Sequence, residues 1–421
     1  MKHAKLTYLG LSKSVYVITF ARMVNSAGNF IFPYLTLLLT SRGHMGEQTV
    51  GLFLLLGAVV QVPGSLLGGK LADRMGRKKI MIGFMGLAAL CFIPCAFLID
   101  IETGFLYIPW LLILSSFFFS MAQPASGAMM NDLTLPENRQ AAFSLLYMGM
   151  NVGSAIGMLI AGVLFSNHMK LLFLGDAATT LLSILLLLLF VKETKPETED
   201  SEQLEEERAD EKAEQGGLIA AMLKRPMLLI FAIFDMLYSF AYAQTNFSLP
   251  LQTKLIFGDN LGAEYFGYFG AINCIEVLLL TTVITLLTRK LRPVFNVSIA
   301  GIFYAIGFGM LFFVQSFWMF VLSTIIWTVG EIINATNIGV YIANHTPITH
   351  RGRFNSIISI ISGTGGAIAP YIMGGFVASR GVTCVWPVIF LISLFASFSM
   401  FLLGSFEKRK TRGNTTEKVM P

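Results

Sequence analysis

Charged side chains are scarce in this sequence of 421 residues, where they make up 13% while hydrophobic residues make up 55%. A soluble globular domain carries about 25% charged residues, so this scarcity excludes an ordinary soluble protein. The mean hydropathy is +0.69, and apolar runs of ~20 residues, the length that crosses a bilayer as a helix, recur throughout the chain. The sequence therefore predicts an all-α integral membrane protein.

Cysteine and histidine are also rare, with four and five residues respectively. The cysteines lie within or at the edges of apolar runs, where a free cysteine usually packs as a small apolar residue; they are Cys91, Cys95, Cys274 and Cys384.

There is no G-x-x-x-x-G-K-[ST] phosphate loop, no nucleophile elbow and no soluble segment long enough for an enzyme domain. We therefore expect no enzyme, no metal and no cofactor, and no direct use of ATP. The modest net charge of +5 also predicts no nucleic-acid partner.

Twelve apolar runs are predicted to cross the membrane, and the longer ones indicate tilted or kinked helices. They cover approximately residues 14–40, 48–69, 80–99, 106–130, 140–166, 170–191, 226–252, 263–287, 294–314, 316–343, 354–379 and 384–405. Of the 30 lysines and arginines, the odd-numbered connections hold only Arg42, Lys170, Lys254 and Arg380. The positive-inside rule then places both termini and the central loop in the cytoplasm, so we expect a multi-pass protein of the cell (cytoplasmic) membrane.

The chain is predicted to consist of two similar halves joined by an acidic linker. Residues 1–191 and 225–405 hold six spans each, residues 192–224 contain KETKPETEDSEQLEEERADEKAEQGG, and residues 406–421 form a cytoplasmic tail. The segments 139–162 and 351–374 align without gaps, with matches such as Gly153 to Gly365. Parallel repeats of this kind place a central cavity between two pseudo-symmetric bundles, which is typical of transporters.

The connection between the second and third spans reads GGKLADRMGRKK over 68–79. Its glycines permit a tight turn, and an aspartate among several basic residues can accept hydrogen bonds from backbone N–H groups or from an arginine. The set of residues in this motif is Gly69, Asp73, Arg74, Gly76, Arg77 and Lys78. This spacing is more specific than an ordinary basic loop.

The chain resembles the major facilitator superfamily, which carries this signature loop between its second and third spans. The segments GEIINATNIGVYIANHTPITHRGRFNSI and MNDLTLPENRQAAFSLLYMGMNVGSAIG are similar to its twelve-helix drug–proton antiporter branch. The resemblance implies alternating access, with the signature loop as a cytoplasmic latch between the halves. Three features depart from that branch: the fifth-span motif reads GSAIGMLIAG without its usual proline, the fourth-span arginine is missing, and the second copy of the loop is reduced to TRKLRP.

Ionisable side chains within the spans cost about 2.5–3.5 kcal/mol to insert, so each is a functional candidate. Arg22, Asn25, Ser26 and Asn29 form a polar stripe at helical spacing, which we expect to face the cavity unless Arg22 extends to the cytoplasmic surface instead. Asp132 and Asp176 lie nearer span ends, where they could reach water or headgroups.

Two acids lie deep in the second half, and the drug–proton antiporters that this chain resembles use acids at matching places for proton coupling. Asp235 shares a face with Tyr238, Ser239 and Tyr242, and Glu331 lies among Trp327, Asn334 and Asn337. A permanently protonated carboxylic acid that bonds two helices is the structural alternative. The predicted coupling acids are Asp235, Glu331 and Glu276, and the predicted cavity residues are Arg22, Asn25, Asn29, Tyr147, Asn151, Tyr238, Tyr242, Trp327 and Asn334.

Three functions are compatible with these observations. The leading hypothesis is a monomeric, proton-gradient-driven exporter of lipophilic, often cationic compounds, with protons, small molecules and the lipid bilayer as its partners. The second is a proton-coupled transporter of one metabolite, such as a sugar, peptide, lipid or siderophore. The third is a non-transporting receptor or assembly factor that binds a partner through the acidic linker.

Overall fold

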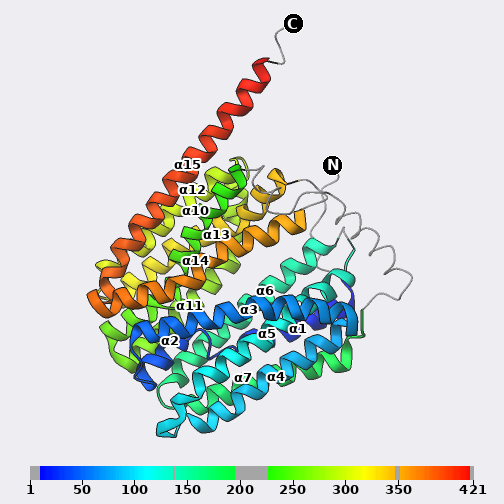
Figure 1. The fold of residues 1–421 in the computed structure, drawn as a ribbon, viewed down its shortest axis with the longest axis vertical. Helices are drawn as coiled ribbons and strands as arrows, with labels where there is room; N and C mark the ends of the chain where they lie inside the picture. The colour runs from blue at the N-terminus through cyan, green and yellow to red at the C-terminus, as the bar shows by residue number, and fades with distance from the viewer. Residues whose placement is uncertain (1–9, 136–137, 195–225, 347–350, 418–421) are drawn as a thin grey trace. The chain divides into compact units, whose positions relative to one another are not determined.

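The computed structural model describes residues 10–135, 138–194, 226–346 and 351–417, with the backbone alone for 351–357 and 410–417. Most of the predicted linker, residues 195–224, lies outside the described residues. The described chain is helical, as predicted (Figure 1). Contacts group it into two compact units, Met1–Glu197 with Asn246–Leu278, and Thr198–Thr245 with Leu279–Pro421. The predicted halves remain a prediction, and these units differ from them by the segment Asn246–Leu278.

The helices of the first half follow the predicted spans closely. They are α1 (Lys13–Ala27), α2 (Leu35–Leu37), α3 (Glu47–Met75), α4 (Arg77–Leu98), α5 (Ile108–Asp132), α6 (Arg139–Phe165) and α7 (Met169–Phe190). The first predicted span, 14–40, is broken, because α1 ends at Ala27 and α2 begins only at Leu35. This break lies within the membrane part of the chain and shapes a cavity described below.

The helices of the second half are α10 (Pro226–Tyr242), α11 (Ser248–Thr288), α12 (Pro293–Gly309), α13 (Phe317–His345), α14 (Arg351–Arg380) and α15 (Val385–Glu417). Within the described residues, ten segments are long and apolar enough to cross a membrane. One of them, Pro226–Thr288, combines α10 and α11, and α11 itself bends at Gly258, where φ is +81°. Counting these as two spans and adding α1, which has only 15 residues, accounts for the twelve predicted spans.

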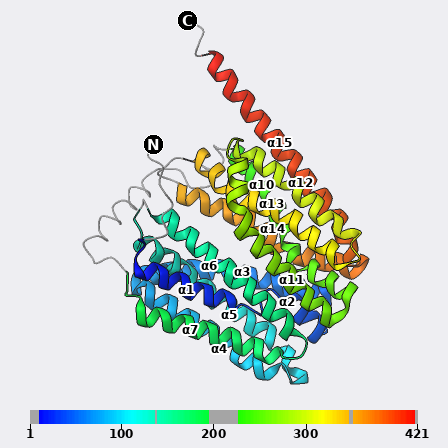
Figure 2. The same cartoon turned by 180° about the vertical axis from the view of Figure 1, so that it is seen from behind.

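The two units pack their helices in the same order. In the first unit the neighbours run α3, α5, α4, α7, α1, α6, and in the second they run α13, α12, α15, α10, α14 (Figures 1 and 2). Because α13 corresponds to α5 and α14 to α6 in chain order, the second series repeats the last five members of the first. The repeat detected between 139–162 and 351–374 is therefore visible in the packing.

Glycines set the closest helix contacts in each unit. A Cβ atom added at Gly153 of α6 would overlap the Met23 carbonyl oxygen of α1, and one at Gly365 of α14 would overlap the Met236 carbonyl oxygen of α10. At Gly157 an added Cβ would lie 2.9 Å from the Ala27 carbonyl oxygen. Small residues of this kind let helix backbones approach closely in a membrane, and equivalent glycines do so in both units.

Gly153→Ala is expected to lower the stability of the first unit, because the new methyl group forces α6 away from α1. Overpacking of this kind typically costs about 1–3 kcal/mol. The measurement is the melting temperature of the purified protein in detergent. Gly83→Ala on α4 is the matched control, since a Cβ there meets nothing within 4 Å; equal melting temperatures for both variants would contradict the argument.

The segment Asn246–Leu278 joins the first unit through hydrogen bonds near the end of its first span. The Tyr34 hydroxyl lies 3.2 Å from the carbonyl of Met158 and 3.1 Å from that of Ala263. The Thr36 hydroxyl donates to the Asn246 carbonyl at 2.7 Å. These bonds connect the first span to α6 and α11, and they explain why contacts group this part of α11 with the first unit.

Candidate functional site

The second unit brings the two predicted coupling acids onto neighbouring polar partners. Asp235 of α10 is buried, and the Asn334 side chain of α13 lies 3.4 Å from its Oδ1, at the long end of hydrogen-bond range. Glu331, one turn before Asn334 on α13, accepts a hydrogen bond of 2.8 Å from the Tyr242 hydroxyl of α10. Both contacts join α10 to α13. In the first, α10 supplies the acid Asp235 and α13 supplies the amide Asn334; in the second, α13 supplies the acid Glu331 and α10 supplies the phenol Tyr242.

Aromatic side chains surround this pair. Trp327 is buried, its ring lies 6.0 Å from that of Tyr242 and it stacks on Phe308 at 5.6 Å. Tyr304 lies 5.7 Å from Tyr238 and 6.4 Å from Tyr242. The faces of such rings attract cations, so rings of this kind beside the two acids favour a positive charge.

The first unit contains a cavity of about 390 Å³ that the polar stripe of α1 lines. The Arg22 guanidinium donates to the Gln123 side chain of α5 at 3.0 Å, and the Asn25 amide donates to Thr180 of α7 at 2.9 Å. The stripe therefore faces a cavity of the first unit, and its predicted place at a central cavity between the two halves remains a prediction. Its lining residues include Arg22, Asn25, Ser26, Asn29, Gln123, Asp176 and Thr180.

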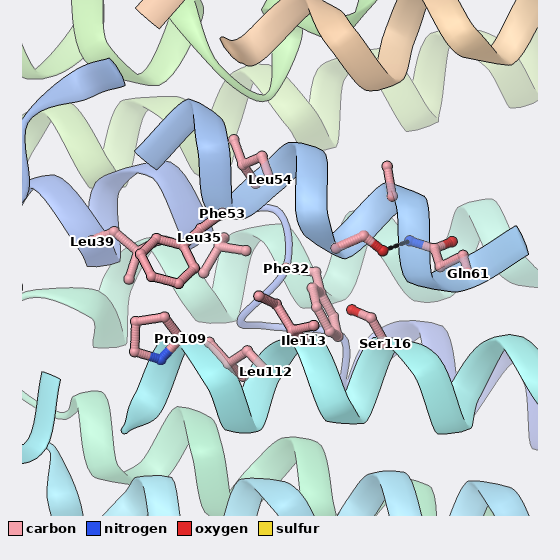
Figure 3. A pocket seen from close by; sticks show the side chains of 12 residues that line it. Phe32, Leu35, Leu39, Phe53, Leu54, Gln61, Pro109, Leu112, Ile113 and Ser116 are labelled. Atoms are coloured by element: carbon pink, nitrogen blue, oxygen red, sulfur yellow. Dashed lines mark hydrogen bonds between the residues drawn. The ribbon is translucent and has the colours of Figure 1, made fainter. Parts of the chain in front are cut away.

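A second, more apolar cavity of about 110 Å³ lies among α2, α3 and α5. Phe32, Gln61 and Ser116 line both cavities and cluster toward one end of the smaller one, while Leu39 and Pro109 lie toward the other (Figure 3). The Gln61 amide donates to the Gly57 carbonyl at 3.1 Å. The two cavities are thus neighbours around Phe32, where the first span is not helical.

Three predicted site residues lie apart from these groups. Tyr147 is 48% exposed, and the Asn151 amide donates to the Tyr147 carbonyl at 2.9 Å on the same helix; neither lines the cavity of about 390 Å³. Glu276 is buried in the part of α11 that belongs to the first unit. Their roles in substrate binding and coupling remain predictions.

The signature loop forms a tight turn that a linker residue caps. Gly76 has φ +106° between α3 and α4, a value that strongly favours glycine. The Glu193 carboxylate accepts hydrogen bonds from the backbone N–H of Arg77 at 2.8 Å and of Lys78 at 3.1 Å. A carboxylate is favourable at a helix N-terminus because it complements the unpaired N–H groups and the helix dipole.

The loop is also held by an ion pair between Arg77 of α4 and Asp132 at the end of α5, with side chains 13% and 23% exposed. Lys78 donates to the Leu188 carbonyl of α7 at 3.0 Å. Of the predicted latch residues, Arg77 anchors the loop to α5 and Lys78 anchors it to α7 within the first unit. A link from this loop to the other unit remains a prediction.

The sequence reasoning missed the roles of Glu193, Asp132 and Asp176. Glu193 is the first acid after the sixth span, and Asp132 is the last residue of the helix that forms the fourth span. The basic residues of the signature loop, which could pair with these acids, were the signal in the sequence. Asp176 carried a weaker signal, since it lies only seven residues into its helix but is 5% exposed.

A known protein family matches most of this chain. The family model described as Major Facilitator Superfamily matches residues 17–308 and 297–419. The chain belongs to the Major Facilitator Superfamily. Its membership makes it a membrane transport protein with a multi-pass fold.

Several superfamily members are similar to this chain. The "Na(+), Li(+), K(+)/H(+) antiporter" of Planococcus maritimus is 24% identical over 402 residues, covering 86% of this chain and 92% of the relative. The "Tetracycline resistance protein, class H" of Pasteurella multocida is 30% identical over 196 residues, covering 44% and 46%. A crystal structure of peptide transporter POT in complex with sulfate aligns with a TM-score of 0.73 at 14% identity, covering 95% and 96%, which shows the fold alone.

Proposed function

We propose that this chain exports lipophilic cations across the cytoplasmic membrane in exchange for protons. The observation that carries the proposal is the pair of acids in the second unit, Asp235 next to Asn334 and Glu331 bonded to Tyr242, set among Trp327 and other aromatic rings. A carboxylate that is removed from water binds a proton more readily, and a bound cation favours its ionised form. Proton and cation then exclude each other, which is the minimum requirement for antiport.

The names of the relatives support cation–proton exchange as the class of activity. One is an antiporter of monovalent cations that aligns over most of both chains, and another is a tetracycline resistance protein that aligns over less than half. The aromatic rings around Glu331 favour an organic cation over a bare ion at this place, because ring faces and apolar walls contribute to its binding. The membership in a transporter family argues against the non-transporting receptor.

The test is transport by the purified chain in proteoliposomes with an imposed pH gradient. We expect ethidium and tetraphenylphosphonium to move against their concentration gradients toward the acidic compartment, and a protonophore to stop this movement. Liposomes without protein and proteoliposomes without a gradient are the controls. Activity confined to one sugar, peptide or siderophore would overturn the drug assignment in favour of the metabolite transporter.

A further inference from the structure

The break in the first span interrupts the regular helical hydrogen bonds of the backbone within the first unit. Helix α1 ends at Ala27, and helical structure resumes at Leu35. Peptide groups in such a break need partners, since hydrocarbon offers none. Asp176 of α7 lies close to the backbone of Phe30 and Ile31 in this break, and an added Cβ atom at the preceding Gly175 would lie 2.9 Å from the Phe30 ring. The carboxylate therefore lies directly against the broken segment.

This carboxylate is only partly satisfied. Asp176 is 5% exposed, and its Oδ2 atom is buried without a hydrogen-bond partner among the described residues. The residue lines the cavity of about 390 Å³. A buried carboxylate oxygen without a partner is costly, so the geometry calls for a ligand that enters this cavity and contacts Oδ2.

The surroundings of Asp176 are rich in oxygen atoms. Thr180 lies one turn further along α7 and accepts the Asn25 amide at 2.9 Å, which leaves the Asn25 carbonyl oxygen and a lone pair on the Thr180 hydroxyl. Ser26 and Asn29 line the same cavity. The C-terminal end of α1 also lies at the break, and a helix C-terminus carries partial negative charge. Carboxylate, carbonyl and hydroxyl oxygens at an interrupted helix are the surroundings in which membrane transporters coordinate small cations.

Arg22 is the competing counter-ion, because it lines the same cavity. Its guanidinium, however, donates to Gln123 at 3.0 Å, and among the described residues no ion pair joins it to Asp176. Arg22 lies within α1, five residues before that helix ends at Ala27, whereas Asp176 lies next to the segment beyond its end. The negative end of the cavity is thus left for another cation.

We propose that Asp176 binds a small monovalent cation such as Na⁺ through its Oδ2 atom, with oxygen atoms of Asn25 and Thr180 beside it. A divalent metal fits less well, because no group of three or more acidic, histidine or cysteine side chains suited to a metal occurs in the described chain. The site lies in the first unit, while the acids of the proposed drug exchange lie in the second. The proposal therefore does not depend on drug efflux.

The test is equilibrium binding of ²²Na⁺ to the purified full-length protein in detergent at pH 8, which needs no transport. We expect saturable binding that unlabelled Na⁺ and Li⁺ displace and tetraphenylphosphonium does not. Asp176→Asn should weaken ²²Na⁺ binding at least tenfold. An asparagine has nearly the same size and keeps one side-chain oxygen next to the broken segment, so it removes the charge with little change in packing.

Two further variants make the result decisive. Thr180→Val should weaken binding several-fold while the carboxylate remains, which keeps the proposal testable if Asp176→Asn does not fold. Asp259→Asn replaces an exposed acid of the same unit and should bind ²²Na⁺ like the parent. The proposal is overturned if Asp176→Asn folds and binds like the parent, or if tetraphenylphosphonium displaces the label. It is also overturned if the parent binds no ²²Na⁺ and Arg22→Gln does, because Arg22 is then the counter-ion.

Discussion

Replacing Glu331 by Gln or Asp235 by Asn is expected to abolish proton-driven export, with a loss of about tenfold or more. A tenfold loss corresponds to about 1.4 kcal/mol, which is small beside the cost of leaving an ionised group in a low-dielectric site. Both substitutions keep the size of the side chain and an oxygen acceptor, so Tyr242 can still donate to residue 331 and Asn334 to residue 235. What they remove is the exchangeable proton.

The measurement separates proton coupling from the movement of the substrate itself. Ethidium transport is followed in proteoliposomes with an imposed pH gradient and again as downhill movement without one. We expect each variant to lose the gradient-driven component and to retain downhill movement. Asp259→Asn, an exposed acid that pairs with Lys254, serves as the control and should behave like the parent. Full gradient-driven activity in Glu331→Gln and Asp235→Asn would contradict their role in coupling.

Arg77→Ala is expected to cause the largest loss of stability at the signature loop. The guanidinium pairs with Asp132, and both side chains are mostly buried, so its removal leaves an uncompensated carboxylate. Breaking a buried pair in this way costs about 3–5 kcal/mol, and the residual exposure of these side chains places the expected loss toward the lower end of that range. The measurement is the melting temperature of the purified protein in detergent.

A charge-exchanged double variant provides the internal check. Arg77→Asp combined with Asp132→Arg should recover part of the melting temperature that either single substitution loses, because the pair is re-formed with the charges reversed. Lys79→Ala, at an exposed position of the same loop, is the matched control and should melt like the parent. If Arg77→Ala melts with the control, the pair contributes nothing and the anchor of the loop is the cap by Glu193.

Much of the fold could be predicted, because a bilayer leaves so few solutions for the backbone. Runs of about 20 apolar residues identified the spans, and helical periodicity placed Arg22 and Asn25 on one face, which in the structure lines a cavity of the first unit. The same periodicity put Tyr242 and Asp235 on one face of α10. What periodicity could not supply was the partner on another helix, so the bond from Tyr242 to Glu331 emerged only from the structure.

The acids near span ends show the limit of such reasoning. Depth along a span is counted from its ends, and on that count Asp176 and Asp132 could reach water. In the structure Asp132 pairs with Arg77, and Asp176 is covered by the broken first span. The break itself begins at Gly28 and includes Pro33, but the second part of the run 14–40 is mostly apolar, and hydropathy alone cannot distinguish a broken helix from a continuous one.

The glycine contacts between α1 and α6 also decide how a lipophilic compound can reach the polar stripe. From Gly153 to Gly157 the two helix backbones approach so closely that an added methyl group would clash with the facing helix, and an acyl chain or a planar dye is far wider than that space. This seam is closed to lateral entry for about one turn. A hydrocarbon-dissolved compound must therefore approach Arg22 and Asn25 by another route than between α1 and α6.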